Sequence, residues 1–120
     1  MKPDGGSLIG FGSGGPGGAV FRAFDPAAGA ELEPGFASAS PEDVERAVRL
    51  AAAAAPAWAR LPAAERRRLL VRIAESLEAH VADLVPRAMR ETGLPENRLK
   101  GEVARTAAQL RLYGEAAVQG

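Results

Sequence analysis

Residues 40–58 read SPEDVERAVRLAAAAAPAW, and this stretch marks the change from a turn-rich start to a helical remainder. Ser40 can cap free backbone N–H groups, Pro41 fits the first turn because its missing N–H costs nothing there, and two acids follow at the positive end of the helix dipole. Pro56 removes a backbone donor, so we expect the helix to kink or finish around Ala55 to Ala59. One helical face carries the apolar positions Val44, Ala47, Val48, Ala51, Ala55 and Trp58.

The residues before this helix favour turns and strands, because ten of the 14 glycines fall within the first 40 residues. Ala19–Phe24 is rich in strand formers, and Ala30–Phe36 can return as a second strand. Between them, Asp25–Gly29 supplies a turn whose proline sets φ and whose glycine tolerates a positive φ. The pattern predicts a β-hairpin, with Leu8–Ile9 as a candidate third short strand.

The residues after this helix predict two more helices. The second begins at Pro62, bends at Pro86 and ends before Gly93, which suits the left-handed position that closes a helix. Pro95 then opens a third helix as its first residue. The second helix is expected to bury the stripe Leu70, Ile73, Leu77, Val81 and Leu84. The third carries a face made of Leu99, Val103, Thr106, Leu110, Tyr113 and Ala117.

These elements together predict an α+β fold in which an N-terminal β-hairpin is followed by three main α-helices. We divide the chain into a Gly-rich N-terminal arm at residues 1–18, a β-hairpin at 19–39 and a helical segment at 40–120 that forms part of a domain. Much of the 47% hydrophobic content is alanine. Helices of this composition pack closely but gain little from each buried residue.

Charge and cysteine content exclude several classes of function. The 120 residues hold 15 basic and 15 acidic side chains, for a net charge of zero. A neutral chain gains no counterion release on nucleic acid and has no polybasic anchor for a membrane, so neither partner is expected. The absence of cysteine excludes disulfides and thiolate metal sites from this chain. We expect a cytoplasmic protein, because an apolar targeting segment is missing from the start of the sequence.

A glycine-rich run, Gly10–Gly15, matches the spacing G-x-G-x-x-G that in other proteins holds a dinucleotide. That motif should leave a strand and open a helix, whose N-terminus then binds the phosphates. Here Pro16, two further glycines and a strand-like run follow, so no helix opens. The context favours a flexible hairpin loop or a disordered arm over cofactor binding.

Three polar features have ordinary structural interpretations. His80 is the single histidine and has no nucleophile or second metal ligand near it in sequence, so a structural or solvent-facing role is favoured. The basic run Arg66–Arg68 lies in a helix that also carries acids, which favours a solvated and partly paired face. Glu102 and Arg105 stand three residues apart and suit a surface ion pair. These residues alone give no catalytic constellation and no metal site.

The order of several short runs resembles the N-terminal segment of the aldehyde dehydrogenase superfamily. The runs are FRAFDPAAG at 21–29, ASPEDVERAV at 39–48, the following alanines and Trp58, LP at 61–62, ER at 65–66, LL at 69–70 and IA at 73–74. Further on, ETGLP at 91–95, GE at 101–102, ART at 104–106 and QLRL at 109–112 look like the subgroup that oxidises 2-oxoglutarate semialdehyde, or 2,5-dioxovalerate. The resemblance spans residues 21–120, and more loosely 8–18.

The resemblance implies an NAD(P)-dependent oxidoreductase in which a thiolate attacks the aldehyde, hydride passes to the nicotinamide and water activated by a glutamate releases the acid. Family members are several times longer, and their cysteine, general-base glutamate and cofactor-binding residues lie beyond the point that matches Gly120. No catalytic or cofactor-binding position can therefore be carried over to this chain. NAD or NADP is expected in the full-length family but not on this chain alone, and the full-length enzyme is expected to be a homo-oligomer.

One site residue is carried over. The third helix lines the mouth of the family's substrate tunnel, and Arg105 matches a tunnel-facing position, so the resemblance implies a substrate-binding role. We therefore expect the chain to be a catalytically incomplete N-terminal part of a 2-oxoglutarate semialdehyde dehydrogenase, with the rest of that fold as its partner. The alternative is a stand-alone α-helical interaction module without enzymatic activity.

Overall fold

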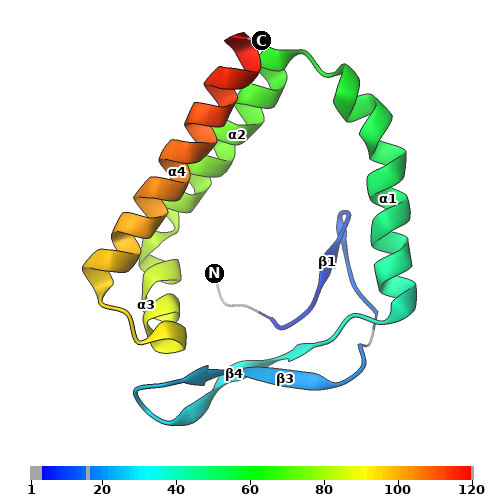
Figure 1. Cartoon of the computed structure of the whole chain (residues 1–120). Helices are drawn as coiled ribbons and strands as arrows, with labels where there is room; N and C mark the ends of the chain where they lie inside the picture. Colours follow the sequence, from blue (N-terminus) through cyan, green and yellow to red (C-terminus); the bar gives the residue numbers. More distant parts are fainter. Residues whose placement is uncertain (1–3, 16, 120) are drawn as a thin grey trace. The chain divides into compact units, whose positions relative to one another are not determined.

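The structure is a computed structural model that describes residues 4–15 and 17–119 (Figure 1). It divides into two compact units, and the boundary falls between Arg60 and Leu61. The first unit holds the strands and one helix, and the second unit holds helices alone. The position of the division means that the helical segment expected at 40–120 is split between the two units.

The first unit contains two separate antiparallel hairpins. β1 (Leu8–Ile9) pairs with β2 (Gly12–Ser13), and β3 (Val20–Asp25) pairs with β4 (Ala30–Ala37). The predicted main hairpin is therefore confirmed. Leu8–Ile9 is a strand as expected, but it is not a third strand of that hairpin, because the turn at Gly10 lets it pair with β2 in a sheet of its own.

The turn between β3 and β4 follows the chemistry that the sequence predicts. The Asp25 side chain accepts hydrogen bonds from the backbone N–H groups of Ala27 and Ala28, both at 3.0 Å. Gly29 closes the turn with a φ of 65°, a conformation that costs glycine little and other residues more. The aromatic rings of Phe21 and Phe36 stack across the two strands at a centroid distance of 5.8 Å.

α1 (Pro41–Arg60) begins with the predicted cap. The Asp43 N–H donates to the Ser40 hydroxyl at 3.1 Å, and the Val44 N–H donates to the Ser40 carbonyl at 3.0 Å. The helix continues through Pro56 and ends at Arg60, one residue beyond the expected zone. Its apolar face is largely exposed, with Val48 at 62% and Trp58 at 45% of their full accessible surface.

The second unit contains α2 (Ala63–Ala79), α3 (Val81–Thr92) and α4 (Glu96–Gln119). The described residues thus form four helices where the sequence predicted three main ones. The predicted second helix is broken at His80, not bent at Pro86, which lies inside α3. Gly93 ends α3 in the left-handed conformation, with a φ of 70°, as predicted. α4 begins at Glu96, one residue later than expected, and the Pro95 carbonyl accepts hydrogen bonds from the N–H groups of Arg98 and Leu99 at 3.1 and 3.3 Å.

Small residues bring α2 and α4 together, and the two helices run side by side in Figure 1. Ala74 and Ala107 have no exposed surface, and Gly114 is buried as well. A Cβ on Gly114 would lie 3.2 Å from Cγ of Arg67, so the helices approach closely at that point. Two ion pairs join the helices: Arg67 to Glu115 at 2.6 Å, and Arg111 to Glu78 at 2.6 Å.

The predicted apolar stripe of the second helix is not buried. Ile73 and Leu84 are each 41% exposed, and the other three stripe residues are only half-buried. On α4, the expected face is buried only in part, because Leu99 is 8% exposed whereas Tyr113 is 64% exposed. The reason is the close contact between α2 and α4. Backbones that approach through alanine and glycine turn the larger side chains of both helices outward.

Candidate functional site

The predicted substrate residue, Arg105, lies on the exposed surface of α4 and is bound to Glu102, one turn earlier. Glu102 Oε2 accepts hydrogen bonds from Arg105 Nε at 3.1 Å and from Nη2 at 2.6 Å. Arg98 Nη2 stands 3.9 Å from the other carboxylate oxygen. The hydrogen bond from Arg105, followed by its charge and that of Arg98, lowers the pKa of the Glu102 carboxyl below 4.5. The expected ion pair is therefore present, with a second arginine at its edge.

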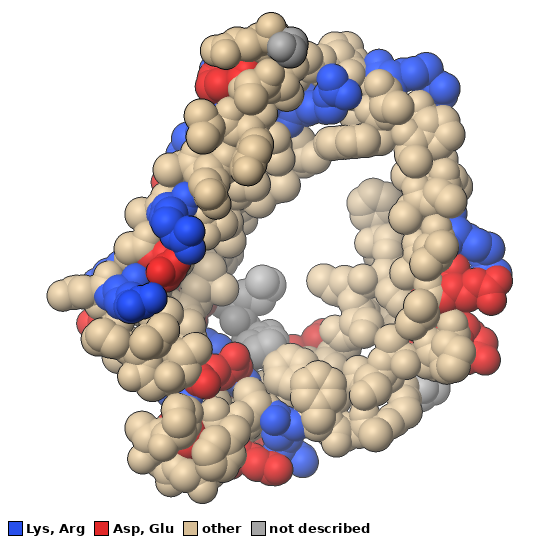
Figure 2. All heavy atoms as spheres, viewed as in Figure 1, with Lys and Arg blue, Asp and Glu red and all other residues tan. Residues whose placement is uncertain are grey.

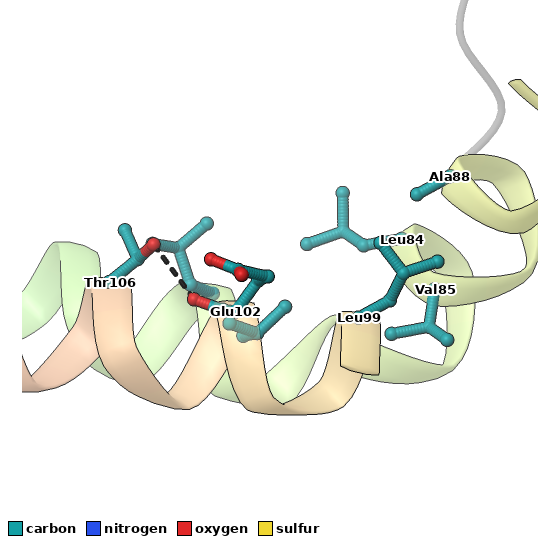
Figure 3. A pocket seen from close by; sticks show the side chains of 8 residues that line it. Leu84, Val85, Ala88, Leu99, Glu102 and Thr106 are labelled. Carbon is teal, nitrogen blue, oxygen red and sulfur yellow. Dashed lines mark hydrogen bonds between the residues drawn. The ribbon is translucent and has the colours of Figure 1, made fainter. Parts of the chain in front are cut away.

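Glu102 also lines a pocket of about 280 Å³ formed by all three helices of the second unit. Figure 3 shows the lining side chains, and those that it labels come from α3 and α4. The complete lining consists of Leu77, Leu84, Val85, Ala88, Leu99, Glu102, Val103 and Thr106. Arg105 is not among these residues, and its ion pair with Glu102 links it to the lining.

The pocket is lined mostly by apolar side chains. Of its eight lining residues, Glu102 alone carries a charge, and the Thr106 hydroxyl already donates to the Glu102 carbonyl at 2.9 Å. Arg105 holds the Glu102 carboxylate in an ion pair. Sequence spacing alone predicted the ion pair. It could not predict the pocket, which depends on residues from three helices.

The glycine-rich run is held by a buried carboxylate that the sequence analysis did not recognise. Asp43 accepts the Gly15 N–H at 3.0 Å through Oδ2 and at 3.2 Å through Oδ1. Arg46 Nη2 bridges the Ser13 carbonyl at 3.0 Å and Asp43 Oδ1 at 3.1 Å. Asp43 is 7% exposed. From its position in the sequence it is recognisable only as an acid in the first turn of a helix, because a lone aspartate there carries no signal for a loop contact.

This anchor argues against a dinucleotide site at Gly10–Gly15. The Gly15 N–H that would face a pyrophosphate is already bound by an acid, and a second negative charge beside Asp43 would be repelled. The run forms the turn after β1 and the strand β2, and β3 is the next element in the chain, so no helix begins there. The glycine-rich run at residues 10–15 therefore does not fit the phosphates of a dinucleotide.

The remaining polar features have structural roles. His80 closes α2, and its Nδ1–H donates to the Ser76 carbonyl at 2.7 Å. In the basic run, Arg67 pairs with Glu115 and Arg68 with Glu65. On the face shown in Figure 2, basic and acidic side chains lie interspersed. Within residues 4–15 and 17–119, no cluster of metal-ligating side chains occurs and no helix is long and apolar enough to cross a membrane.

Comparison with known proteins shows what this chain is similar to. The model of the aldehyde dehydrogenase family matches residues 15–119. An alpha-ketoglutaric semialdehyde dehydrogenase 2 of Azospirillum brasilense is 43% identical over 102 residues, which cover 84% of this chain and 19% of the relative. An alpha-ketoglutaric semialdehyde dehydrogenase of Bacillus subtilis is 43% identical over 72 residues, or 60% of this chain and 15% of the relative.

A solved structure shares the fold. A crystal structure of a Burkholderia cenocepacia protein described as an aldehyde dehydrogenase superimposes with a TM-score of 0.77 at 36% sequence identity. The superposition covers 85% of this chain and 21% of that one. The chain therefore spans about one fifth of the length of the relatives that it matches over most of its own residues.

Proposed function

Because the chain belongs to the aldehyde dehydrogenase family, we propose that it forms the N-terminal part of an NAD(P)-dependent enzyme that oxidises 2-oxoglutarate semialdehyde to 2-oxoglutarate. The observation that carries this proposal is the 43% identity over 102 residues to a relative named for that substrate. The same name recurs in the Bacillus subtilis relative. A semialdehyde with a carboxylate is therefore the substrate class that the similarity favours.

This chain builds part of the fold and positions Arg105, and the chemical steps belong to the rest of the fold. Thiolate attack on an aldehyde needs a cysteine, and these 120 residues contain none. The glycine-rich run is occupied by Asp43 and does not suit a pyrophosphate. The partner of this chain is accordingly the remainder of the aldehyde dehydrogenase fold, which binds NAD or NADP, assembles as a homo-oligomer and works in the cytoplasm.

Arg105 is the residue through which this chain contacts the substrate. Its side chain is 67% exposed and pairs with Glu102, which lines the pocket of the second unit. An arginine in this position can accept a carboxylate through charge-assisted hydrogen bonds. A neutral aldehyde gains nothing from that contact, so Arg105 favours the charged semialdehyde.

A segment exchange tests the proposal. The matching segment of the Azospirillum brasilense relative is replaced by this chain, and NAD(P)H formation is measured with 2-oxoglutarate semialdehyde. We expect a folded chimaera that oxidises this substrate. The matched control carries Ala74→Arg, which places a charge in the contact between α2 and α4 and should abolish folding and activity together. A soluble, folded chimaera without activity on any aldehyde would refute the proposed function.

A further inference from the structure

We infer that Arg66 on α2 is a docking point for an acidic side chain from the remainder of the aldehyde dehydrogenase fold. The inference rests on the proposed function, which makes that remainder the partner of this chain. It adds the point of contact, the charge of the partner's side chain and the apolar character of the segment that carries it.

Arg66 carries a buried polar atom that has no hydrogen-bond partner. Its Nε is buried, and none of the residues that the structure describes accepts a hydrogen bond from it. The residue as a whole is half-buried, and its backbone N–H already donates to the Pro62 carbonyl at 3.2 Å. A guanidinium stays charged in proteins, so leaving one of its N–H groups buried and unsatisfied costs free energy. Buried polar groups of native proteins are hydrogen-bonded, so an acceptor is expected from a further segment.

The acids that pair with the basic run at 66–68 serve its other two members. Glu115 pairs with Arg67 at 2.6 Å, and Glu65 pairs with Arg68 at 2.5 Å. Arg66 itself forms no ion pair within the described part of the chain. The run therefore leaves one half-buried cation for a partner of opposite charge.

The surface around Arg66 is apolar. Leu69, Leu70 and Ile73 follow Arg66 by three, four and seven residues, so they share its face of α2. Leu69 is 43% exposed and Ile73 is 41% exposed. An acidic side chain alone would leave these two residues in water. We therefore expect the acid to lie within an apolar segment that covers Leu69 and Ile73 as it docks.

Chain length and charge favour the remainder of the fold over a second copy as the source of the acid. This chain covers 19% of its Azospirillum brasilense relative, so most of that relative lies outside the matching segment. A second copy has little free negative charge to offer, because most acids of the second unit already pair with arginine or lysine. Six acids are paired in this way: Glu65, Glu78, Glu91, Glu96, Glu102 and Glu115.

Arg66→Met in the purified 120-residue chain is the first test. Methionine keeps the unbranched shape and the helix preference of arginine but needs no hydrogen bond. We expect the denaturant midpoint to stay the same or to rise, because an unsatisfied buried donor is removed. Analytical ultracentrifugation should show the same species before and after the substitution. A lower midpoint would place the partner of Arg66 within the chain, and loss of a dimer would place it in a second copy; either result would overturn the inference.

The same substitution in the segment-exchange chimaera should have the opposite effect. It leaves the partner's carboxylate buried without a cation, so we expect the thermal midpoint to fall by about 3 °C or more. Arg66→Lys keeps the charge and should recover part of this loss. As the matched control, Arg72→Met removes an exposed cation of α2 and should shift the midpoint of neither the chain nor the chimaera. An active chimaera whose midpoint is unchanged by Arg66→Met would reject the docking point and leave the proposed enzyme function standing.

Discussion

At the scale of single residues, Asp43 shows how one carboxylate can organise a glycine-rich run. It joins the Gly15 N–H, the Arg46 side chain and the first turn of α1 in one group of contacts. Buried acids that accept such bonds are expensive to remove, because their partners are left unsatisfied. We predict that Asp43→Ala lowers the free energy of unfolding by about 1–3 kcal/mol. Denaturant titration measures this change.

Glu45, on the same helix, provides a matched control for Asp43→Ala. Glu45 pairs with Arg49 on the exposed side of α1, and Glu45→Ala should change the free energy of unfolding by less than about 0.5 kcal/mol. Equal losses for the Glu45 and Asp43 variants would show that Asp43 acts only through helix charge and not through the glycine-rich run.

Arg105 gives the second prediction at this scale. In the segment-exchange chimaera, Arg105→Ala should raise KM for 2-oxoglutarate semialdehyde by about tenfold, because one charge-assisted contact is lost. KM for a neutral aldehyde of the same length should stay unchanged, and so should kcat for both. Steady-state kinetics with the two substrates measures the difference. Parallel changes for both substrates would contradict carboxylate recognition by Arg105.

At the scale of elements, the contact between α2 and α4 depends on small residues. Ala107 has no exposed surface, so Ala107→Leu forces the two helices apart, and we expect a loss of about 1–3 kcal/mol in the free energy of unfolding. Ala104→Leu places the same side chain on the exposed side of α4 and should change stability by less than about 0.5 kcal/mol. Similar thermal midpoints for the two variants would contradict the proposed packing.

Low pH should weaken the contact between α2 and α4. A bidentate hydrogen bond from Arg111 lowers the pKa of Glu78 below its ordinary 4.5, and the same bond raises the pKa of Arg111. The carboxylate therefore stabilises the folded state fully above pH 4.5. Below that value the unfolded chain binds protons first, and the contribution disappears as the pH falls through the lowered pKa of the folded state.

The corresponding experiment is a double-mutant cycle at pH 7 and pH 3. Glu78→Gln and Arg111→Gln should each flatten the acid dependence of unfolding, and the double variant should add no further flattening. An unaltered acid dependence in either single variant would exclude this pair as its source.

Local chemistry made the helices and strands predictable from the sequence, whereas contacts between residues far apart in the chain were not predictable. Ser40 and Gly93 act within one turn of chain, so their sequence signals identified the start of α1 and the end of α3 correctly. The break at His80 has no such signal, because a histidine tolerates helix and cap alike. The apolar stripe of the predicted second helix, which spans α2 and α3, was wrongly expected to be buried, because alanine makes the contact between α2 and α4.

The candidate site likewise has one part that local spacing predicts and another that it does not. Glu102 and Arg105 are three residues apart on one helix, so spacing alone predicted their ion pair. The pocket beside them needs Leu77, Val85 and Leu99 from three helices, and no local pattern reports how these helices meet. The role of Asp43 at Gly15, 28 residues away in sequence, was missed for the same reason.

At the scale of the whole molecule, apolar side chains lie exposed in both units. They include Val48 and Trp58 on α1 and Leu112 and Tyr113 on α4. Such surface is typical of a chain that is stabilised by a further partner. We infer that this partner is the remainder of the aldehyde dehydrogenase fold, which agrees with a chain that spans 19% of its Azospirillum brasilense relative.

The most direct measurement compares two preparations. One is the purified chain, and the other is the chain co-expressed with the Azospirillum brasilense relative from which the matching segment has been deleted. NADH and NADPH formation from 2-oxoglutarate semialdehyde is recorded for both preparations and for the deleted relative alone. The account predicts no turnover by either part alone and restored turnover by the co-expressed pair. Oxidation of the aldehyde by the 120-residue chain alone would contradict it.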